Sequence, residues 1–311
     1  MNNKVKGYIL GAIAAATYGM NPLFALPLYQ DGMSPDSVLL FRYCFAIPIV
    51  ALMMWIRGRS FAIQKKEILP LFLMGLTFSL SSLTLFASYN HMDVGIASTI
   101  LFVYPILVAL IMSIFFKEKF TLSTGICLAL ATLGIALLYK TEDGGTLSTT
   151  GTLLVFASAL SYAIYIVAVN KSATLRAIPT LKVIFYVLIS GSLLFISRLC
   201  ITKDFQMPTQ WYLWGNLLAL AVFPTAISLI CTTRAIQLIG STPTAILGAL
   251  EPVTAVIIGV MVFSEKLTAQ SSAGLLLIII AVTIVIAGGK FSSALVGLKK
   301  MFPKILRKAK K

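Results

Sequence analysis

The stretch Val103-Tyr104-Pro105, followed after an apolar run by Phe116-Lys117-Glu118-Lys119-Phe120-Thr121, recurs in altered form later in the chain. There it reads Leu250-Glu251-Pro252 and then Phe263-Ser264-Glu265-Lys266-Leu267-Thr268, a shift of 147 positions that places Pro105 on Pro252. A shared proline and a shared Glu-Lys pair do not follow from apolar composition alone. The sequence therefore predicts an internal repeat, and each copy contains this proline and this Glu-Lys pair.

A second pair of matching segments opens the two halves of the chain. At a shift of 144 positions, it aligns Gly7, Leu10, Ala15 and Tyr18 with Gly151, Leu154, Ala159 and Tyr162. We interpret the halves as residues 1–140 and residues 150–289. The alternative is a fused duplication that is kept only for packing.

The composition places this repeat in a membrane. Hydrophobic residues make up 59% of the 311 residues, charged residues 11%, and the mean hydropathy is +0.95. A soluble domain has about 25% charged residues. This chain has too few to cover its surface, so that surface is expected to face lipid. Ten apolar runs are long enough to span a bilayer: 7–29, 36–56, 67–88, 94–116, 121–139, 150–169, 178–200, 209–233, 243–263 and 268–288.

Five spans per half is an odd number, so the second half must cross the membrane upside down relative to the first. The fold class is therefore expected to be an all-α membrane protein with ten transmembrane helices in two inverted five-helix repeats. Inverted repeats are typical of secondary transporters, because two similar halves can exchange conformations and thereby exchange the side that is open.

The basic residues predict the orientation. The chain has 25 Lys and Arg against 10 Asp and Glu, a net charge of +15. With the N-terminus inside, twenty bases lie in inner segments, four in outer segments, and Arg42 within a span. This asymmetry predicts that both termini are cytoplasmic. The basic segment 290–311 is expected to form an amphipathic helix on the anionic inner leaflet, or else a disordered tail.

The motifs quoted above resemble those of the drug/metabolite transporter superfamily, EamA type. The second half also contains Ser241-Thr242-Pro243-Thr244-Ala245, and the second span contains Phe41-Arg42-Tyr43. The resemblance covers about residues 7–288 and implies a transporter of amino acids, other small metabolites or drugs. It also implies a location in the bacterial inner membrane.

Other chemistry finds little support in the sequence. Gly288-Gly289-Lys290 lacks the upstream glycine and the following Ser or Thr of a phosphate-binding loop. The four cysteines have no metal-ligand spacing, and His91 with Asp93 lacks the motifs of a hydrolase. We therefore expect no enzyme activity, no cofactor, no metal site and no nucleic-acid partner.

Glu251 is the residue that points most directly to a function. It lies about 12 Å into its span, near the middle of a bilayer core of about 30 Å. A carboxyl group at that depth is expected to be functional, and it could bind a proton during transport. Pro252 removes a backbone donor beside it, and Tyr104 is its counterpart in the first repeat. The alternative is a neutral glutamic acid that only packs against a neighbouring helix.

Further polar and aromatic residues lie at depth on shared helix faces. A cavity lined by aromatic rings with a few polar groups suits a small amphipathic ligand, although such residues also serve helix packing. Arg42 is predicted either to attract an anion or to extend to the membrane interface. The predicted substrate-binding residues are Tyr18, Asn21, Ser82, Phe86, Tyr104, Tyr162, Tyr165, Ser228 and Glu251.

These observations predict a secondary transporter that moves small amphipathic metabolites through a central midplane cavity by alternating access. The expected substrates are amino acids, related compounds or drugs, and the expected partners are the substrate and the lipid bilayer. Since the two halves are fused, the chain is expected to act as a monomer. The alternative is a non-transporting membrane sensor or a channel-like facilitator on the same fold.

Overall fold

Every regular element of the described part of the chain is a helix. The computed structural model describes residues 2–88, 91, 97, 100–138, 148–262 and 269–287. The first half contains α1 (Asn3–Tyr18), α2 (Asn21–Gln30), α3 (Pro35–Ile56), α4 (Lys65–Ser88), α6 (Tyr104–Phe116) and α7 (Leu122–Leu138). Three predicted features lie outside the described residues: the tail 290–311, the second Glu-Lys motif at 263–268, and Asp93.

The second half repeats this order with more interruptions. It contains α8 (Thr149–Lys171), the short α9 (Ala173–Ala177), α10 (Thr180–Thr202), α11 (Leu213–Leu220), the π-helix η1 (Ala221–Ile227), α12 (Ser228–Ile239), α13 (Ser241–Leu247), α14 (Leu250–Val262) and α15 (Ala269–Ala287). The α11–η1–α12 segment runs as one rod from Leu213 to Ile239.

The helices have the length and composition of membrane spans. Seven helical stretches among the described residues are long and apolar enough to cross a bilayer, and three shorter apolar helices accompany them. Large apolar side chains lie exposed on the outside of the bundle, as Phe115 and Met261 do, with exposed fractions of 73% and 79%. Water cannot cover such a surface, so the chain is a multi-pass integral membrane protein.

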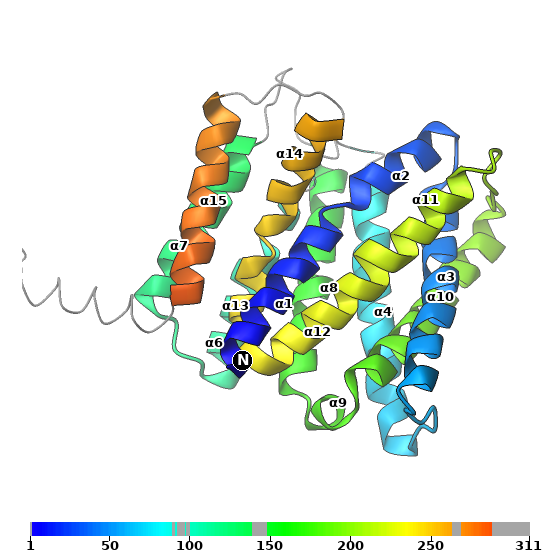
Figure 1. The fold of residues 1–311 in the computed structure, drawn as a ribbon, viewed down its shortest axis with the longest axis horizontal. Coiled ribbons are helices and arrows are strands. Elements are labelled where there is room, and N and C mark those ends of the chain that lie inside the picture. Colours follow the sequence, from blue (N-terminus) through cyan, green and yellow to red (C-terminus); the bar gives the residue numbers. More distant parts are fainter. Residues whose placement is uncertain are drawn as a thin grey trace, which may run out of the picture.

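Contacts between the two halves occur in matched pairs. Helix α4 packs against α8, and its repeat counterpart, the α11–α12 rod, packs through α12 against α1. Helix α6 packs against α8, and the corresponding pair is α14 with α1. The last helices of each half, α7 and α15, lie side by side at one edge of the bundle (Figure 1). These pairings are those of a two-repeat fold.

Helix α10 crosses α4 at a point where small residues let the two backbones approach. A Cβ atom added at Gly75 would overlap the Ser190 side chain and lie 2.8 Å from the Val187 carbonyl oxygen. On the facing helix, a Cβ atom at Gly191 would overlap the Ser79 hydroxyl. Small residues at such crossings are how membrane helices pack closely without a hydrophobic driving force.

We therefore expect Gly75→Ala to destabilise the protein by about 1–3 kcal/mol, because the added methyl group overpacks a backbone contact. Gly215→Ala in α11 is the matched control, since nothing lies within 4 Å of its Cβ position. Thermal unfolding of both purified variants in detergent checks the prediction. Equal stability of the two variants would show that the crossing can widen without loss.

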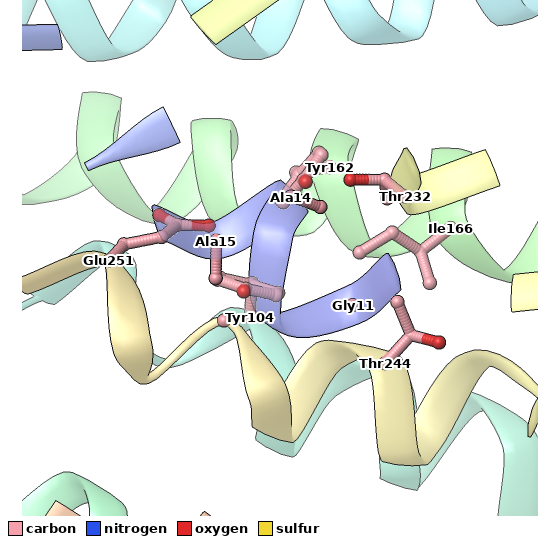
Figure 2. A pocket seen from close by; sticks show the side chains of 10 residues that line it. Gly11, Ala14, Ala15, Tyr104, Tyr162, Ile166, Thr232, Thr244 and Glu251 are labelled. Carbon is pink, nitrogen blue, oxygen red and sulfur yellow. The ribbon is translucent and has the colours of Figure 1, made fainter. Parts of the chain in front are cut away.

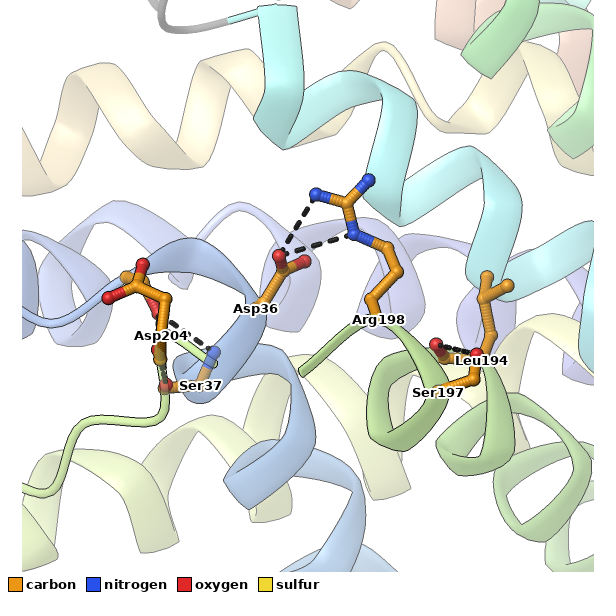
Figure 3. A network of polar contacts seen from close by, with 7 residues as sticks. Asp36, Ser37, Leu194, Ser197, Arg198 and Asp204 are labelled. Atoms are coloured by element: carbon orange, nitrogen blue, oxygen red, sulfur yellow. Dashed lines mark hydrogen bonds and ion pairs between the residues drawn. The ribbon is translucent and has the colours of Figure 1, made fainter. Parts of the chain in front are cut away.

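Polar contacts join the halves where α2 turns into α3, at the upper right of Figure 1. Figure 3 shows Arg198 of α10 donating to the Asp36 carboxylate through Nε at 3.2 Å and Nη2 at 3.0 Å. The Ser37 hydroxyl donates to the Asp204 carbonyl oxygen at 3.2 Å. Nearby, hydrogen bonds from the hydroxyl and the backbone N–H of Thr209 hold the pKa of the Asp31 carboxyl below its usual value.

A second ion pair joins the halves near the opposite end of α10. The Lys182 ammonium lies 2.9 Å from the Glu67 carboxylate on α4, and each side chain is only 10% exposed. Glu67 also accepts a hydrogen bond from the Gln64 backbone N–H at 3.0 Å. Helix α10 is thus tied to the first half by charges near both of its ends.

Candidate functional site

Two repeat-related helices are interrupted at equivalent positions. Helix α13 ends at Leu247 and α14 begins at Leu250, while α6 begins at Tyr104 after a turn at residues 102–103. Pro105 and Pro252 follow these breaks and lack the N–H that a continuous helix would need. Discontinuous helices near mid-membrane are where secondary transporters build their sites, so the breaks mark the candidate region.

A third interruption lies against the second. Helices α1 and α2 are separated by Gly19 and Met20, and Gly19 faces the start of α14. A Cβ atom at Gly19 would collide with the Glu251 carbonyl oxygen and approach the Thr254 side chain to 2.9 Å. Glycine at this position therefore allows the end of α1, which includes Tyr18, to pack directly against Glu251.

A small cavity lies between these interrupted helices (Figure 2). The centre of a water-sized sphere can occupy only about 10 Å³ of it, which is room for about one water molecule. The site is therefore almost closed in this conformation. A metabolite can bind in it only if the helices separate. Its lining residues are Gly11, Ala14, Ala15, Tyr104, Tyr162, Ile166, Thr232, Thr244, Gly248 and Glu251.

Tyrosine rings form one wall of the cavity. The ring centroids of Tyr104 and Tyr162 lie 4.9 Å apart in an edge-to-face arrangement, and Tyr165 stacks behind Tyr162 at 6.3 Å. The Tyr104 hydroxyl donates to the Ala245 carbonyl oxygen at 3.2 Å, across the interface between the repeats. This bond connects the two interrupted helices. An aromatic wall with hydroxyl edges can contact both apolar and cationic groups.

Glu251 supplies the acidic group of the cavity. Its carboxyl group extends from α14 toward α1, where Ala15 lies (Figure 2). The Tyr18, Tyr104 and Tyr162 hydroxyls are within electrostatic range of it. We find no hydrogen bond or ion pair from this carboxyl to any residue that the structure describes. If Glu251 served only helix packing, its carboxyl would need a hydrogen bond to a neighbouring helix, and the described residues provide none.

Arg42 is buried and points into the bundle. Its side chain is on α3, and the residue is 3% exposed. Its Nε donates to the Thr225 hydroxyl and its Nη2 donates to the Pro224 carbonyl oxygen at 3.1 Å, both in the π-helix η1. Its guanidinium carbon lies 5.8 Å from the Tyr18 ring centroid. The Arg42 side chain thus ends at buried acceptors of η1.

The structure brings some predicted residues to the cavity and leaves others beside it. Tyr104, Tyr162 and Glu251 line it, and Tyr18 lies next to Glu251. The remaining predicted residues make other contacts. The Ser228 hydroxyl donates to the Ala14 carbonyl oxygen at 3.0 Å, which ties α12 to α1 behind the cavity wall.

Four further predicted residues lie outside the cavity lining: Asn21, Ser82, Phe86 and Tyr165, the last of which stacks on Tyr162. The Ser82 hydroxyl donates to the Phe78 carbonyl oxygen of its own helix at 3.3 Å. Phe86 meets Tyr29 edge to face, with ring centroids 6.2 Å apart. The Asn21 Oδ1 atom is buried without a hydrogen bond among the described residues.

Sequence reasoning missed the small residues of the lining. Gly11, Ala14 and Ala15 recur at three- and four-residue steps on one face of α1, a spacing that was available in the sequence. Gly248 lies three residues before Glu251, and a Cβ atom there would overlap the Tyr104 hydroxyl. Small residues look like packing contacts in a sequence, and only the neighbouring helix shows that they face a cavity.

Comparison with known proteins finds a solved structure of the same fold and transporters among the relatives in sequence. A solved structure described as "Crystal structure of protein" has the same fold, with a TM-score of 0.75 and 16% identity, and the match covers 89% of this chain and 95% of that chain. Among curated proteins, the uncharacterized transporter YvbV of Bacillus subtilis (strain 168) is 25% identical over 304 residues, which is 94% of this chain and 95% of the relative. The uncharacterized transporter sll1319 of Synechocystis sp. is 28% identical over 226 residues, or 70% of this chain and 63% of that one.

A family model gives the same result for both halves. The model of the EamA-like transporter family matches residues 5–140 and again residues 149–287, so each half of the chain matches it separately. The two matches together cover most of the 311 residues. The resemblance to this family that the Pro and Glu-Lys motifs indicated is thereby confirmed, and the chain belongs to the EamA-like transporter family.

Proposed function

We propose that this membrane transporter moves small amphipathic metabolites, such as amino acids, related compounds or drugs, by alternating access at the cavity around Glu251. The observation that carries the proposal is the placement of this carboxyl. It has no hydrogen-bonding partner among the described residues, faces an aromatic wall, and lies where repeat-related helices are interrupted. A carboxyl at membrane depth is expensive to keep there, which favours a role in binding.

The pairing of the halves supports alternating access. Each main contact between the halves has a counterpart in which the repeats exchange roles, such as α4 with α8 and α12 with α1. An inverted arrangement would let the halves exchange conformations and expose the cavity to alternate sides. In this proposal the chain has ten transmembrane helices, both termini are cytoplasmic, and segment 290–311 lies on the inner leaflet of a bacterial inner membrane.

The alternatives on the same fold differ in what they require of the cavity. A channel-like facilitator needs a continuous aqueous path in its open state, whereas the cavity here has room for about one water molecule. A sensor needs binding without passage. The matched contacts between the two halves favour a carrier over a pore, and the family membership favours transport over sensing.

The proposal is tested in proteoliposomes that contain the purified full chain. With radiolabelled natural amino acids as probes, we expect uptake that saturates with concentration and that accelerates when the liposomes are preloaded with the same unlabelled compound. Such acceleration requires a carrier whose binding site returns to the outside faster with bound substrate than without it. Flux that rises linearly with concentration would instead identify a channel, and binding without flux would identify a sensor.

A further inference from the structure

The Tyr104 side chain fits into a gap that Gly248 leaves between α13 and α14. Tyr104 is only 3% exposed, and its hydroxyl lies where a Cβ atom of residue 248 would be. Such a Cβ atom would also lie 3.0 Å from Cζ of the Tyr104 ring. The backbone angles of Gly248, φ −55° and ψ −22°, are ones that any residue adopts. Glycine is therefore needed at this position for the close approach of the tyrosine and not for the turn.

A backbone group of the helix break holds the hydroxyl in this gap. The Tyr104 hydroxyl donates to the Ala245 carbonyl oxygen at 3.2 Å, and the Gly248 N–H donates to the same oxygen at 3.1 Å. Tyr104 thus lies beside the turn that separates α13 from α14 (Figure 2). On its other side, the ring meets Tyr162 with the centroids 4.9 Å apart. The ring is therefore fixed between α8 and the break.

The internal repeat indicates that this fit works in one direction only. At the shift of 147 positions, Tyr104 corresponds to Glu251, and Leu101 corresponds to Gly248. The first repeat thus has a leucine at the position of the gap, and the second has a carboxyl group at the position of the ring. Exchange of the repeats would set Glu251 against Leu101. The contact of Tyr104 with Gly248 would therefore have no equivalent in the conformation that such an exchange produces.

The contact lies at one end of the interface between α6 and α13. Tyr104 begins α6, Ala245 belongs to α13, and the two helices pack against each other. Further along this interface, Ala109 and Ile246 belong to one buried apolar cluster. In the proposed orientation, the far end of α6 and the start of α13 are cytoplasmic. The two helices are then the cytoplasmic halves of interrupted spans, and Tyr104 joins them next to the cavity.

We propose that Gly248 is a positioning residue for the Tyr104 hydroxyl, and that this contact, which we call the latch, closes the cytoplasmic side of the cavity. For a substrate to pass between the cavity and the cytoplasm, the hydroxyl leaves the gap and α6 separates from α13. This inference rests on the proposed alternating access and deepens it by naming a contact that must break. Because the hydroxyl fits only where residue 248 lacks a Cβ atom, the latch can be disabled from either partner.

The access of a thiol reagent to the cavity tests the latch. Thr232 lines the cavity from α12 and is 7% exposed, so Thr232→Cys places a probe there with little change in size. The four natural cysteines are first replaced with alanine in the full chain. A charged, membrane-impermeant thiosulfonate is then added to sealed vesicles of each orientation, without substrate. The labelling rate measures the fraction of molecules in which the cavity is open to that side.

Three variants give a pattern that is specific to the latch. Gly248→Ala is expected to speed labelling from the cytoplasmic side about tenfold or more, because the methyl group and the hydroxyl cannot occupy the same place. Tyr104→Phe loses one hydrogen bond and is expected to speed it about fivefold. Tyr104→Phe/Gly248→Ala is expected to label more slowly than Gly248→Ala and close to the rate of Tyr104→Phe, since a small shift of the ring then makes room for the methyl group.

Two matched controls lie outside this region. Gly215→Ala adds a methyl group where nothing lies within 4 Å, and Tyr212→Phe removes a hydroxyl from a tyrosine that is 54% exposed. Both controls are expected to label at the rate of the parent protein. Acceleration by either control that matches the corresponding latch variant would show that the labelling rate does not depend on the latch.

The double variant and the side of labelling decide the result. If Tyr104→Phe/Gly248→Ala labels as fast as Gly248→Ala, the methyl group acts through general overpacking, and the latch is wrong. Equal acceleration from both sides would also contradict it, because the latch closes one side only. If Gly248→Ala does not fold, the decision rests on Tyr104→Phe, and a cytoplasmic labelling rate equal to that of the parent protein rejects the latch.

These outcomes are independent of the transport assay, since labelling is measured without substrate. If the latch pattern is absent while the wild type shows saturable exchange, this inference fails and the transport proposal stands. If the latch pattern is present but the wild type shows no saturable exchange of any compound, the transport proposal fails and the latch stands as a contact that closes the cavity.

Discussion

Replacement of Glu251 with Gln is expected to abolish the response of substrate flux to an imposed pH gradient. In the wild type, a proton and the cationic end of a substrate compete for one carboxyl, so a proton taken up on one side promotes release of substrate there. Gln keeps the size of the side chain and much of its hydrogen bonding, but it cannot ionise. Flux should continue downhill without coupling, at substrate concentrations high enough to offset weaker binding.

The surroundings of Glu251 make this test specific. The titratable side chains that face it are Tyr18 on α1, Tyr104 on α6 and Tyr162 on α8, with Arg42 beyond Tyr18. The described residues of α15, which also packs against α14, include no titratable group. Since Tyr and Arg do not change charge near neutral pH, a pH response that Glu251→Gln removes is assigned to this carboxyl.

Flux in proteoliposomes is measured with and without a pH gradient for wild type, Glu251→Gln and Glu118→Gln. Glu118 is exposed just beyond the end of α6 and serves as the matched acid outside the cavity. The wild type should bind substrate less tightly as the pH falls, because a protonated carboxyl cannot pair with an ammonium group. A wild type that ignores the gradient, or a Gln variant that responds as strongly as the wild type, would make Glu251 structural and the protein a facilitator.

The sequence predicted the parts of this site that depend on repetition and depth. Glu251 and Tyr104 are repeat counterparts beside prolines, and the structure places both on the cavity next to helix breaks. A proline can be read from a sequence, and so can its effect on the helix. The position of a residue along a span is similarly accessible, since each residue rises by about 1.5 Å.

The sequence could not predict which way a deep side chain points. Arg42 turns inward because η1 presents the Pro224 carbonyl oxygen and the Thr225 hydroxyl. Pro224 indicates a disturbed helix in the sequence, but it does not indicate the π-helical turn that aims these two acceptors at Arg42. Ser82 and Ser228 share the polarity of site residues, yet each is satisfied by a backbone carbonyl oxygen. Ser82 bonds within its own helix and Ser228 bonds across to α1, so the polarity of a hydroxyl group alone does not mark a ligand site.

The second large effect is expected at the buried ion pair of α10. Lys182→Met leaves Glu67 with only the Gln64 backbone N–H as a partner, in a position where the side chain is 10% exposed. An uncompensated buried carboxylate is strongly destabilising, but this pair lies near the helix ends and close to water. We therefore expect a loss of about 2 kcal/mol, between the values for exposed and fully buried pairs, seen as a lower unfolding temperature in detergent.

Arg198→Met breaks the other ion pair of α10 and provides the matched control. The Arg198 side chain is 40% exposed, so water can solvate Asp36 after the substitution, and the expected loss is below about 1 kcal/mol. The double variant Glu67→Gln/Lys182→Met removes the unpaired charge and should recover most of the stability lost by Lys182→Met. If the double variant is no more stable than Lys182→Met, the lysine stabilises α10 through its apolar stem and not through its charge.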